Sequence, residues 1–138
     1  MYTRSRRIYV QDTDVTGVIY FANLMHIGIE TFEEFLHQQE FDFQNILKEK
    51  TLSLPIVHSD ADFESPIFLG DILEIRLSIQ EIGTSSFTHL SEMWTKRGRG
   101  AVVRFVHVAY SPAKEKKIPL PLELVKVLSS NDAECMKE

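Results

Sequence analysis

The sequence has little of what would betray a function by composition alone. It holds one cysteine in 138 residues, Cys135, which excludes a disulfide framework and a thiolate metal cluster. Its six glycines are scattered, so there is no phosphate-cradling loop, and no Gly-x-Ser-x-Gly nucleophile elbow occurs. No apolar run approaches the roughly 20 residues that cross a bilayer. These absences argue against disulfide scaffolds, nucleotide-binding loops, elbow-type serine hydrolases and membrane spans.

The charge balance is acidic, with 15 Lys and Arg against 20 Asp and Glu, for a net charge of −5. Nucleic-acid binding rests on clustered cations, so we expect no nucleic-acid partner. Met1 leads into polar residues without an apolar segment, so we expect no secretory signal, no membrane association and a cytoplasmic location. The length predicts one domain over residues 1–128, with a polar C-terminal tail over residues 129–138.

Hydrophobic periodicity predicts one long helix early in the chain. Residues 4–10 have the character of a strand and residues 11–17 that of a polar loop. From Asn23 to Gln38 apolar residues recur at spacings of three and four, which predicts an amphipathic helix. Asn23 is a candidate cap, and Ile19–Phe21 form the alternative first turn.

The rest of the chain is mostly extended in pattern. Leu73 to Ile79 alternates apolar and polar residues, as a half-buried strand does, while 101–110 is almost wholly apolar and predicts a central strand covered on both faces. Three prolines predict the end of regular structure. A long helix followed by hairpin-linked strands favours an α+β fold with the helix packed on an antiparallel sheet. The remaining expected elements are a short helix over 43–48 and strands over 56–63 and 86–96, and the prolines are Pro112, Pro119 and Pro121.

Three polar residues in the predicted strand 56–63 raise the question of a metal site. His58, Asp60 and Asp62 share one face of a strand, so an imidazole and two carboxylates would converge. In the simpler interpretation these side chains face solvent, and we predict no metal. The buried face of the strand would then be formed by Val57, Ala61 and Phe63.

A polar loop just before the long helix is the stronger candidate for chemistry. It carries two carboxylates, Asp12 and Asp14, ahead of a helix start whose N–H groups are unpaired and positive in potential. A carboxylate can attack a carbonyl or activate water while the helix N–H groups hold the oxyanion, which suits acyl transfer. The residues alone leave open the alternative that both aspartates only form Asx turns or balance the helix dipole.

The stretch from Asp12 to Phe21 resembles the signature of the 4-hydroxybenzoyl-CoA thioesterase family. That signature is Asp-x-Asp-x-x-Gly, an aliphatic pair, an aromatic pair and then a long helix. The resemblance covers about residues 6–121 and implies the hot-dog fold, a long helix wrapped in an antiparallel sheet. Further agreements occur at Asp62-Phe63-x-x-Pro66, Gly70-Asp71 and Gly83-Thr84-Ser85-Ser86.

The resemblance assigns roles by position. It implies that Asp14 is the catalytic carboxylate and that a backbone N–H near Phe21 stabilises the oxyanion. Gly17 would allow close approach to the thioester, where a Cβ would intrude. Tyr20 and Phe21 would line the acyl pocket, and His58 could hydrogen-bond a ring hydroxyl of the acyl group.

Within the family the chain is most similar to the cyanobacterial and plastid 1,4-dihydroxy-2-naphthoyl-CoA hydrolases. This implies hydrolysis of 1,4-dihydroxy-2-naphthoyl-CoA in phylloquinone or menaquinone biosynthesis. A broad short- or medium-chain acyl-CoA thioesterase and a non-catalytic acyl-CoA-binding module are the alternatives. The segments that carry the closer likeness are 43–47, 54–58, 62–63 and 119–121.

Coenzyme A would enter as part of the substrate, so no cofactor is expected. Its phosphates need local cations, which two groups of residues could supply. A single sheet with one helix also leaves an edge and an outer face to cover, so we expect a homodimer or homotetramer. The first group of cations is Lys96, Arg97 and Arg99, and the alternative group is Lys114, Lys116 and Lys117.

Overall fold

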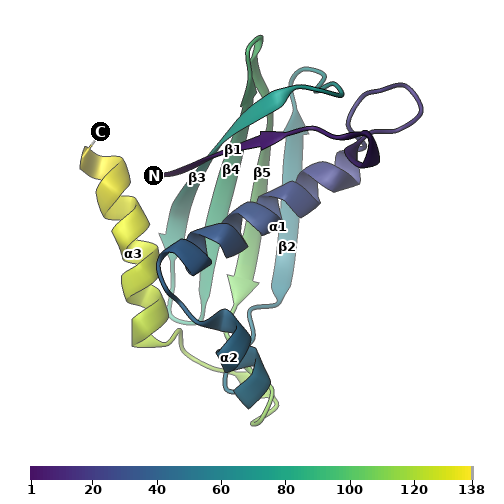
Figure 1. The fold of residues 1–138 in the computed structure, drawn as a ribbon. Coiled ribbons are helices and arrows are strands. Elements are labelled where there is room, and N and C mark those ends of the chain that lie inside the picture. Colours follow the sequence, from purple (N-terminus) through teal and green to yellow (C-terminus); the bar gives the residue numbers. More distant parts are fainter. Residues whose placement is uncertain (138) are drawn as a thin grey trace.

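The computed structural model describes the backbone of residues 1–137 and the side chains of residues 1–130. A five-stranded antiparallel sheet in the order β1-β3-β4-β5-β2 curves around one long helix, α1 (Figure 1). This is the α+β, hot-dog arrangement that the resemblance implies. The strands are β1 (Tyr2–Arg7), β2 (Ile56–Phe63), β3 (Ile72–Ile82), β4 (Ser86–Thr95) and β5 (Gly98–Val108), with a small hairpin of β6 (Tyr110–Ser111) and β7 (Lys116–Lys117). The helices are α1 (Phe21–Gln38), α2 (Phe43–Glu49), α3 (Leu122–Lys137) and a 3-10 turn, η1 (Val10–Asp12).

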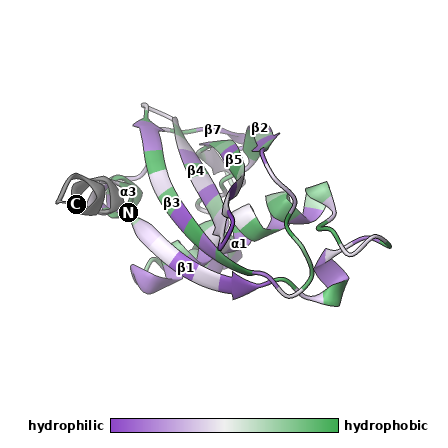
Figure 2. Ribbon diagram, turned by 90° about the horizontal axis from the view of Figure 1, so that it is seen from above, coloured by the Kyte–Doolittle hydropathy of each residue, from purple (hydrophilic) through white to green (hydrophobic). Residues whose placement is uncertain are grey.

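The central strands show why this sequence forms a sheet with one dry face. Leu73, Ile75 and Leu77 of β3 are fully buried, while the residues between them are exposed or half-buried. Because successive side chains of a strand point to opposite faces, the apolar set faces α1. Figure 2 shows the resulting alternation of hydrophilic and hydrophobic residues along β3. The predicted half-buried strand is confirmed.

Helix α1 presses its apolar stripe into this face. Leu24, Ile27 and Phe35 are each 1% exposed, and they recur at helical spacing. At the middle of the helix Gly28 allows an unusually close approach to the sheet. A Cβ at that position would lie 2.8 Å from a ring carbon of Phe105, so any larger residue would force the helix away.

The observed helix and strand starts differ from the predicted ones. Helix α1 begins at Phe21, with Tyr20 as its N-cap, and the Asn23 side chain bonds to the loop instead of capping the helix. The alternative first turn was therefore nearer the truth than the Asn23 cap. Strand β1 ends at Arg7 and not at Val10, because Val10–Asp12 form the turn η1.

The C-terminal prolines do not end regular structure, and that prediction is wrong for the last segment. Helix α3 starts directly after Pro121, whose carbonyl accepts a hydrogen bond from the Val125 N–H at 3.0 Å. Leu124 and Leu128 are fully buried, and α3 packs against β3. Cys135 lies outside the residues whose side chains are described, and the domain boundary at 128 stays a prediction.

Strand β2 forms one edge of the sheet, which corrects the prediction of its buried face. Val57 and Phe63 are 59% and 54% exposed because no strand lies beyond β2, and only Ala61 packs partly against the core. Strand β5 is interior, as predicted, but only one of its faces is buried: Val103 and Phe105 are covered, while Val102 is half-exposed. The chain thus leaves Val57 and Phe63 exposed at this edge of the sheet.

Two histidines lie inside the core beneath α1. His107 donates from Nδ1 to the Leu54 carbonyl at 2.8 Å, so its Nε2 accepts from Nε2 of His89 at 3.0 Å. Burial lowers the pKa of both, and His107 lowers that of His89 further. Both are therefore neutral at neutral pH.

No helix in the described part of the chain is long and apolar enough to cross a membrane.

Candidate active site

The loop ahead of α1 presents Asp14 to solvent in an ionised state. Its Oδ1 accepts hydrogen bonds from the Thr16 N–H at 2.8 Å and the Thr16 hydroxyl at 2.5 Å. These bonds lower the pKa of Asp14 below its ordinary value. The Asp14 N–H also donates to the Val18 carbonyl at 2.9 Å. A charged carboxylate is thus held in a short closed turn.

Asp12, the other member of the pair, is buried and already committed. Arg6 donates to both of its carboxylate oxygens, at 2.8 and 3.3 Å, and the Tyr9 N–H donates at 2.8 Å. Burial raises the pKa of Asp12, but these hydrogen bonds outweigh burial and hold it below the ordinary value. Asp12 is therefore committed to the structure of the loop, and Asp14 is left as the accessible carboxylate of the pair.

The start of α1 offers N–H donors next to this loop. The Tyr20 N–H donates to the Asp12 carbonyl at 3.0 Å, and the Asn23 N–H donates to the Tyr20 carbonyl at 2.8 Å. Within the described part of the chain, the N–H groups of Phe21 and Ala22 have no hydrogen-bond partner. Free N–H groups at a helix N-terminus attract negative charge. They lie where the sequence predicted an oxyanion donor.

An apolar cavity of about 440 Å³ lies beside the loop and the helix start. Val18, which bonds to Asp14, lines it, as does Phe21. The Phe21 ring meets the Phe63 ring of β2 edge to face at 6.4 Å. Ligand pockets commonly span about 300–1,000 Å³ and are mostly apolar with a few polar groups. The other lining residues are Ile19, Leu24, Glu64, Ser65, Pro66 and Ile67.

Gly17 closes the turn that carries Asp14, for a reason other than the expected one. Its φ is +80°, a conformation that residues with a Cβ rarely adopt, and its N–H donates to the Asp14 carbonyl at 3.1 Å. Nothing lies within 4 Å of where a Cβ would be. The backbone conformation alone therefore accounts for glycine here, and the close approach to a thioester stays a prediction.

Two other predicted pocket residues lie apart from the cavity lining. Tyr20 is exposed and does not line the cavity, although its ring lies tilted against that of Phe21, with ring centroids 5.0 Å apart. His58 projects from the outer face of β2, because Ala61, on the opposite face, packs toward the core. Its Nε2 lies 3.1 Å from Asp60. Within one chain His58 and the cavity are not brought together.

The predicted phosphate-binding cations lie near the cavity, but two of them are already paired. Arg97 forms two hydrogen bonds to Asp71, at 3.1 and 2.5 Å, and Arg99 is held by Glu64 and Glu92. Within the described residues, Lys96 forms no ion pair and is exposed at the tip of the β4–β5 turn. The alternative lysines at 114, 116 and 117 lie on the β6–β7 hairpin.

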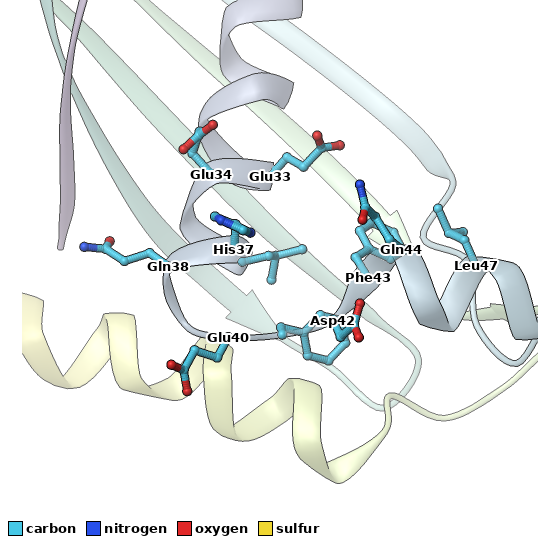
Figure 3. Close-up of a pocket in the computed structure, with 11 residues that line it drawn as sticks. Glu33, Glu34, His37, Gln38, Glu40, Asp42, Phe43, Gln44 and Leu47 are labelled. Carbon is cyan, nitrogen blue, oxygen red and sulfur yellow. The ribbon is translucent and has the colours of Figure 1, made fainter.

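A larger cavity, of about 910 Å³, lies at the opposite end of α1, between that helix and α2 (Figure 3). Four carboxylates line it, and the C-terminal end of a helix adds negative potential. Both features oppose the phosphates of coenzyme A. Among the described residues, no cluster of His, Cys, Asp or Glu side chains is arranged to hold a metal ion. The four carboxylates are Glu33, Glu34, Glu40 and Asp42.

The sequence did not predict two parts of the site: the wall of the smaller cavity that comes from β2 and the residues after it, and the side chains that hold Asp12 in the loop. The segment from Phe63 to Ile67 forms that wall, although the Asp62-Phe63-x-x-Pro66 motif was already visible in the sequence. The side chains that hold Asp12 are those of Arg6 and Asn23. For Arg6, the local signal in the sequence is its alternation with Arg4, which places both arginines on one face of strand β1.

Comparison with known proteins gives the same loop and fold a family. A 1,4-dihydroxy-2-naphthoyl-CoA hydrolase from Nostoc punctiforme is 36% identical over 96% of this chain and 91% of its own length. One from Picosynechococcus is 37% identical over 87% of this chain and 86% of its own. The crystal structure of a 1,4-dihydroxy-2-naphthoyl-CoA thioesterase from Synechocystis superposes with a TM-score of 0.88 at 29% identity, covering 95% of this chain and 97% of that one. The family model of the Thioesterase-like superfamily matches residues 8–128, and the chain belongs to that superfamily.

Proposed function

We propose that this protein is an acyl-CoA thioesterase that hydrolyses 1,4-dihydroxy-2-naphthoyl-CoA to 1,4-dihydroxy-2-naphthoate and coenzyme A. One observation carries the proposal: an ionised, exposed Asp14 lies in a turn bonded to Val18, a lining residue of an apolar cavity at a helix start. The names of the cyanobacterial relatives support the choice of acyl group.

Asp14 supplies the reacting carboxylate in either of two routes. In the first, it attacks the thioester carbonyl, coenzyme A leaves as the thiolate, and water hydrolyses the resulting mixed anhydride. In the second, it takes a proton from water, which attacks the carbonyl directly. Both routes consume one water and release one acid and one thiol. Both need the charged form of Asp14, and its lowered pKa provides that form at neutral pH.

The helix start supplies the electrostatic half of the reaction. Negative charge builds on the carbonyl oxygen as the tetrahedral intermediate forms, and preorganised N–H groups stabilise it without reorganising. Phe21 N–H, with Ala22 N–H beside it, is the proposed donor, because neither has a partner within the described residues. Removing one such donor in other enzymes costs about 10²–10³ in kcat.

The cavity favours a flat aromatic acyl group. Phe21 and Phe63 meet edge to face at its mouth, and an acyl ring can stack on either face. Such a ring pair is worth about 0.5–1.5 kcal/mol beyond the buried area. Two contacts would give about a tenfold to hundredfold preference over a flexible chain. Lys96 is the proposed contact for a coenzyme A phosphate, with Arg97 and Arg99 nearby. No cofactor is needed, since coenzyme A is part of the substrate.

Release of free thiol, measured across a panel of coenzyme A thioesters, tests this proposal. The panel contains 1,4-dihydroxy-2-naphthoyl-, benzoyl-, hexanoyl- and palmitoyl-CoA. We expect the highest kcat/KM for the naphthoyl ester. Equal or better turnover of the aliphatic esters would favour a broad acyl-CoA thioesterase. Binding of the esters without thiol release would favour a non-catalytic module.

We further propose that the protein works as a homodimer or homotetramer. Strand β2 leaves unpaired backbone groups at the sheet edge, and Val57 and Phe63 are exposed beside it. Exposed apolar edges associate unless they are covered, and a second copy would cover this one. Light scattering at micromolar concentration should give a multiple of 15.9 kDa. A particle of monomer mass would contradict this part.

The resemblance to the naphthoyl-CoA hydrolases also suggests a cellular location and a pathway for the reaction. We propose a cytoplasmic protein that acts in phylloquinone or menaquinone biosynthesis, as its resemblance to the naphthoyl-CoA hydrolases implies. Deleting its gene should lower the cellular quinone and raise the naphthoyl thioester, both measured by mass spectrometry. An unchanged quinone level in the deletion strain would argue against this setting.

A further inference from the structure

The main-chain carbonyl of Asp12 joins the catalytic loop to the start of α1. It accepts a hydrogen bond from the Tyr20 N–H at 3.0 Å and a second from Nδ2 of Asn23 at 2.9 Å. A carbonyl oxygen has two lone pairs, so these two bonds saturate it. The first donor is the N-cap residue of α1, and the second is a side chain of its first turn.

The side chain of Asp12 is held just as firmly from the other direction. Its carboxylate is bound by Arg6 and by the Tyr9 N–H, and Arg6 also donates to Glu30 of α1 at 3.1 Å. Asp12 is 6% exposed, so its bonds are shielded from water. Both ends of the residue are therefore tied, directly or through Arg6, to the same helix.

Asp14 depends on this arrangement for its position. Its own hydrogen bonds go to Thr16, Gly17 and Val18, which belong to the same turn. Those bonds shape the turn but do not tie it to the helix. The turn is also bonded to residues 67–69, through the Gly17 carbonyl and the Ile19 N–H, but its hydrogen bonds to the start of α1 are those that Asp12 accepts. A misplacement of about 1 Å between reacting groups can cost about 10²-fold in rate.

Asparagine at position 23 is not explained by the helix alone. Asn23 lies inside the first turn and not at the cap, and there asparagine is a poorer helix former than alanine. Its backbone N–H bonds to Tyr20 and needs no particular side chain. What asparagine adds is the amide donor that reaches the Asp12 carbonyl. An aspartate of the same shape would lack that donor.

We propose that Asn23 is a positioning residue for thioester hydrolysis, acting through the Asp12 carbonyl to fix Asp14 relative to the N-terminus of α1. The inference rests on the proposed thioesterase function and adds a residue to it. Asn23 does not touch the substrate in this scheme. Its loss should therefore lower kcat and leave KM nearly unchanged.

The test compares two variants with a matched control in the full-length protein. Asn23→Ala removes the donor and favours the helix, while Asn23→Asp keeps the shape, suits the helix dipole and also removes the donor. Asp42→Ala is the control, because it deletes the capping bond to the Asn45 N–H at 3.1 Å in α2, far from the loop. Steady-state kinetics on 1,4-dihydroxy-2-naphthoyl-CoA are measured with thermal unfolding for each protein.

We expect both Asn23 variants to lose about tenfold to hundredfold in kcat, with KM within about threefold of wild type. The control should keep both constants while losing similar or greater stability. Asn23 variants with kcat within about threefold of wild type, beside an inactive Asp14→Asn, would overturn the positioning role alone. A control that loses as much kcat would also overturn it, by assigning the effect to general stability. A wild type without turnover on any thioester would overturn the proposed function together with this inference.

Discussion

The two ends of α1 carry opposite chemistry. At its N-terminus the helix faces an apolar cavity of about 440 Å³ and the exposed carboxylate of Asp14, while Glu64, which also lines this cavity, is paired with Arg99. At its C-terminus it faces a cavity of about 910 Å³ lined by four carboxylates. The larger space has the helix dipole and the side-chain charge against an anionic ligand, and the smaller has the dipole in favour. The proposed reaction therefore favours the smaller cavity over the larger one.

The comparison shows that the electrostatic potential of a cavity, as well as its volume, decides whether it suits an acyl-CoA. An acyl-CoA brings negative phosphates and develops negative charge on its carbonyl oxygen. Of these two ends, the N-terminal one combines an apolar wall with N–H donors and Asp14, the proposed reacting carboxylate. The following predictions test that contrast, beginning with the largest expected effect.

Replacing Asp14 by Asn should abolish most turnover. The change keeps the shape of the side chain but removes the charge that attacks the carbonyl or activates water, which commonly costs at least about 10²-fold. Steady-state kinetics give the loss, and circular dichroism checks the fold. Asp42→Asn is the matched change at the other end of α1 and should keep full activity. Asp14→Asn activity within about threefold of wild type would refute the assignment.

Removing the ring of Phe63 should weaken the preference for aromatic substrates. The proposed stacking of the acyl ring on Phe63, a lining residue of the smaller cavity, would be lost, at a cost of about 0.5–1.5 kcal/mol, or about threefold to tenfold in kcat/KM for the naphthoyl ester. Hexanoyl-CoA hydrolysis should change less. Phe43→Ala, at the acidic end, is the control and should leave the ratio of the two esters as it is. An unchanged ratio in Phe63→Ala would remove this residue from the acyl site.

The interior between the two ends should respond to pH on its own. His89 and His107 have lowered pKa values in the native state, so below about pH 6.5 the unfolded chain binds more protons than the folded one. The contribution of the two neutral histidines to the free energy of unfolding is fully present above that pH. It falls as the pH drops below it, by up to about 1.4 kcal/mol per pH unit for each histidine. Urea unfolding from pH 7 to pH 5 measures this slope. His89→Phe should make it shallower, and equal slopes would contradict the assignment.

Neutralising the acidic end should have the smallest effect. Glu33→Gln and Glu34→Gln remove charge from the larger cavity without disturbing a buried group, and such surface changes usually stay within about 0.5 kcal/mol. The kcat/KM for the naphthoyl ester should stay within about threefold of wild type. A tenfold loss would show that the C-terminal end takes part in substrate binding after all.

Much of the fold could be predicted because its signals are local. The alternation in β3 and the helical spacing in α1 each lie within one segment. The same logic failed for β2, since Val57 and Phe63 alternate correctly but an edge position leaves them uncovered. It also missed α3, because the prolines at 119 and 121 predict an end to regular structure just before the helical spacing of Leu124 and Leu128.

The site divides in the same way. Asp14 and Phe21 belong to one continuous motif, so their pairing was visible in the sequence. The cavity wall from Phe63 to Ile67 is brought to them by long-range contacts, the pairing of β2 with β5 and the hydrogen bond from the Ile19 N–H to the Ile67 carbonyl. The Asn23 bond to Asp12 could not be foreseen, because an asparagine near a helix start is most often a cap.

Gly28 gives α1 a single axial register on the sheet. The notch it leaves is filled by Phe105 and Val103, whose atoms would lie 2.8 and 2.9 Å from a Cβ. Sliding the helix by one turn would bring Leu24 or Phe32 to that notch, where neither fits. The close approach at Gly28 therefore fixes the position of α1 along its axis. Gly28, which lines neither cavity, thus determines where both ends of α1 lie relative to the sheet. It thereby also determines the position of the proposed N–H donors at the helix start.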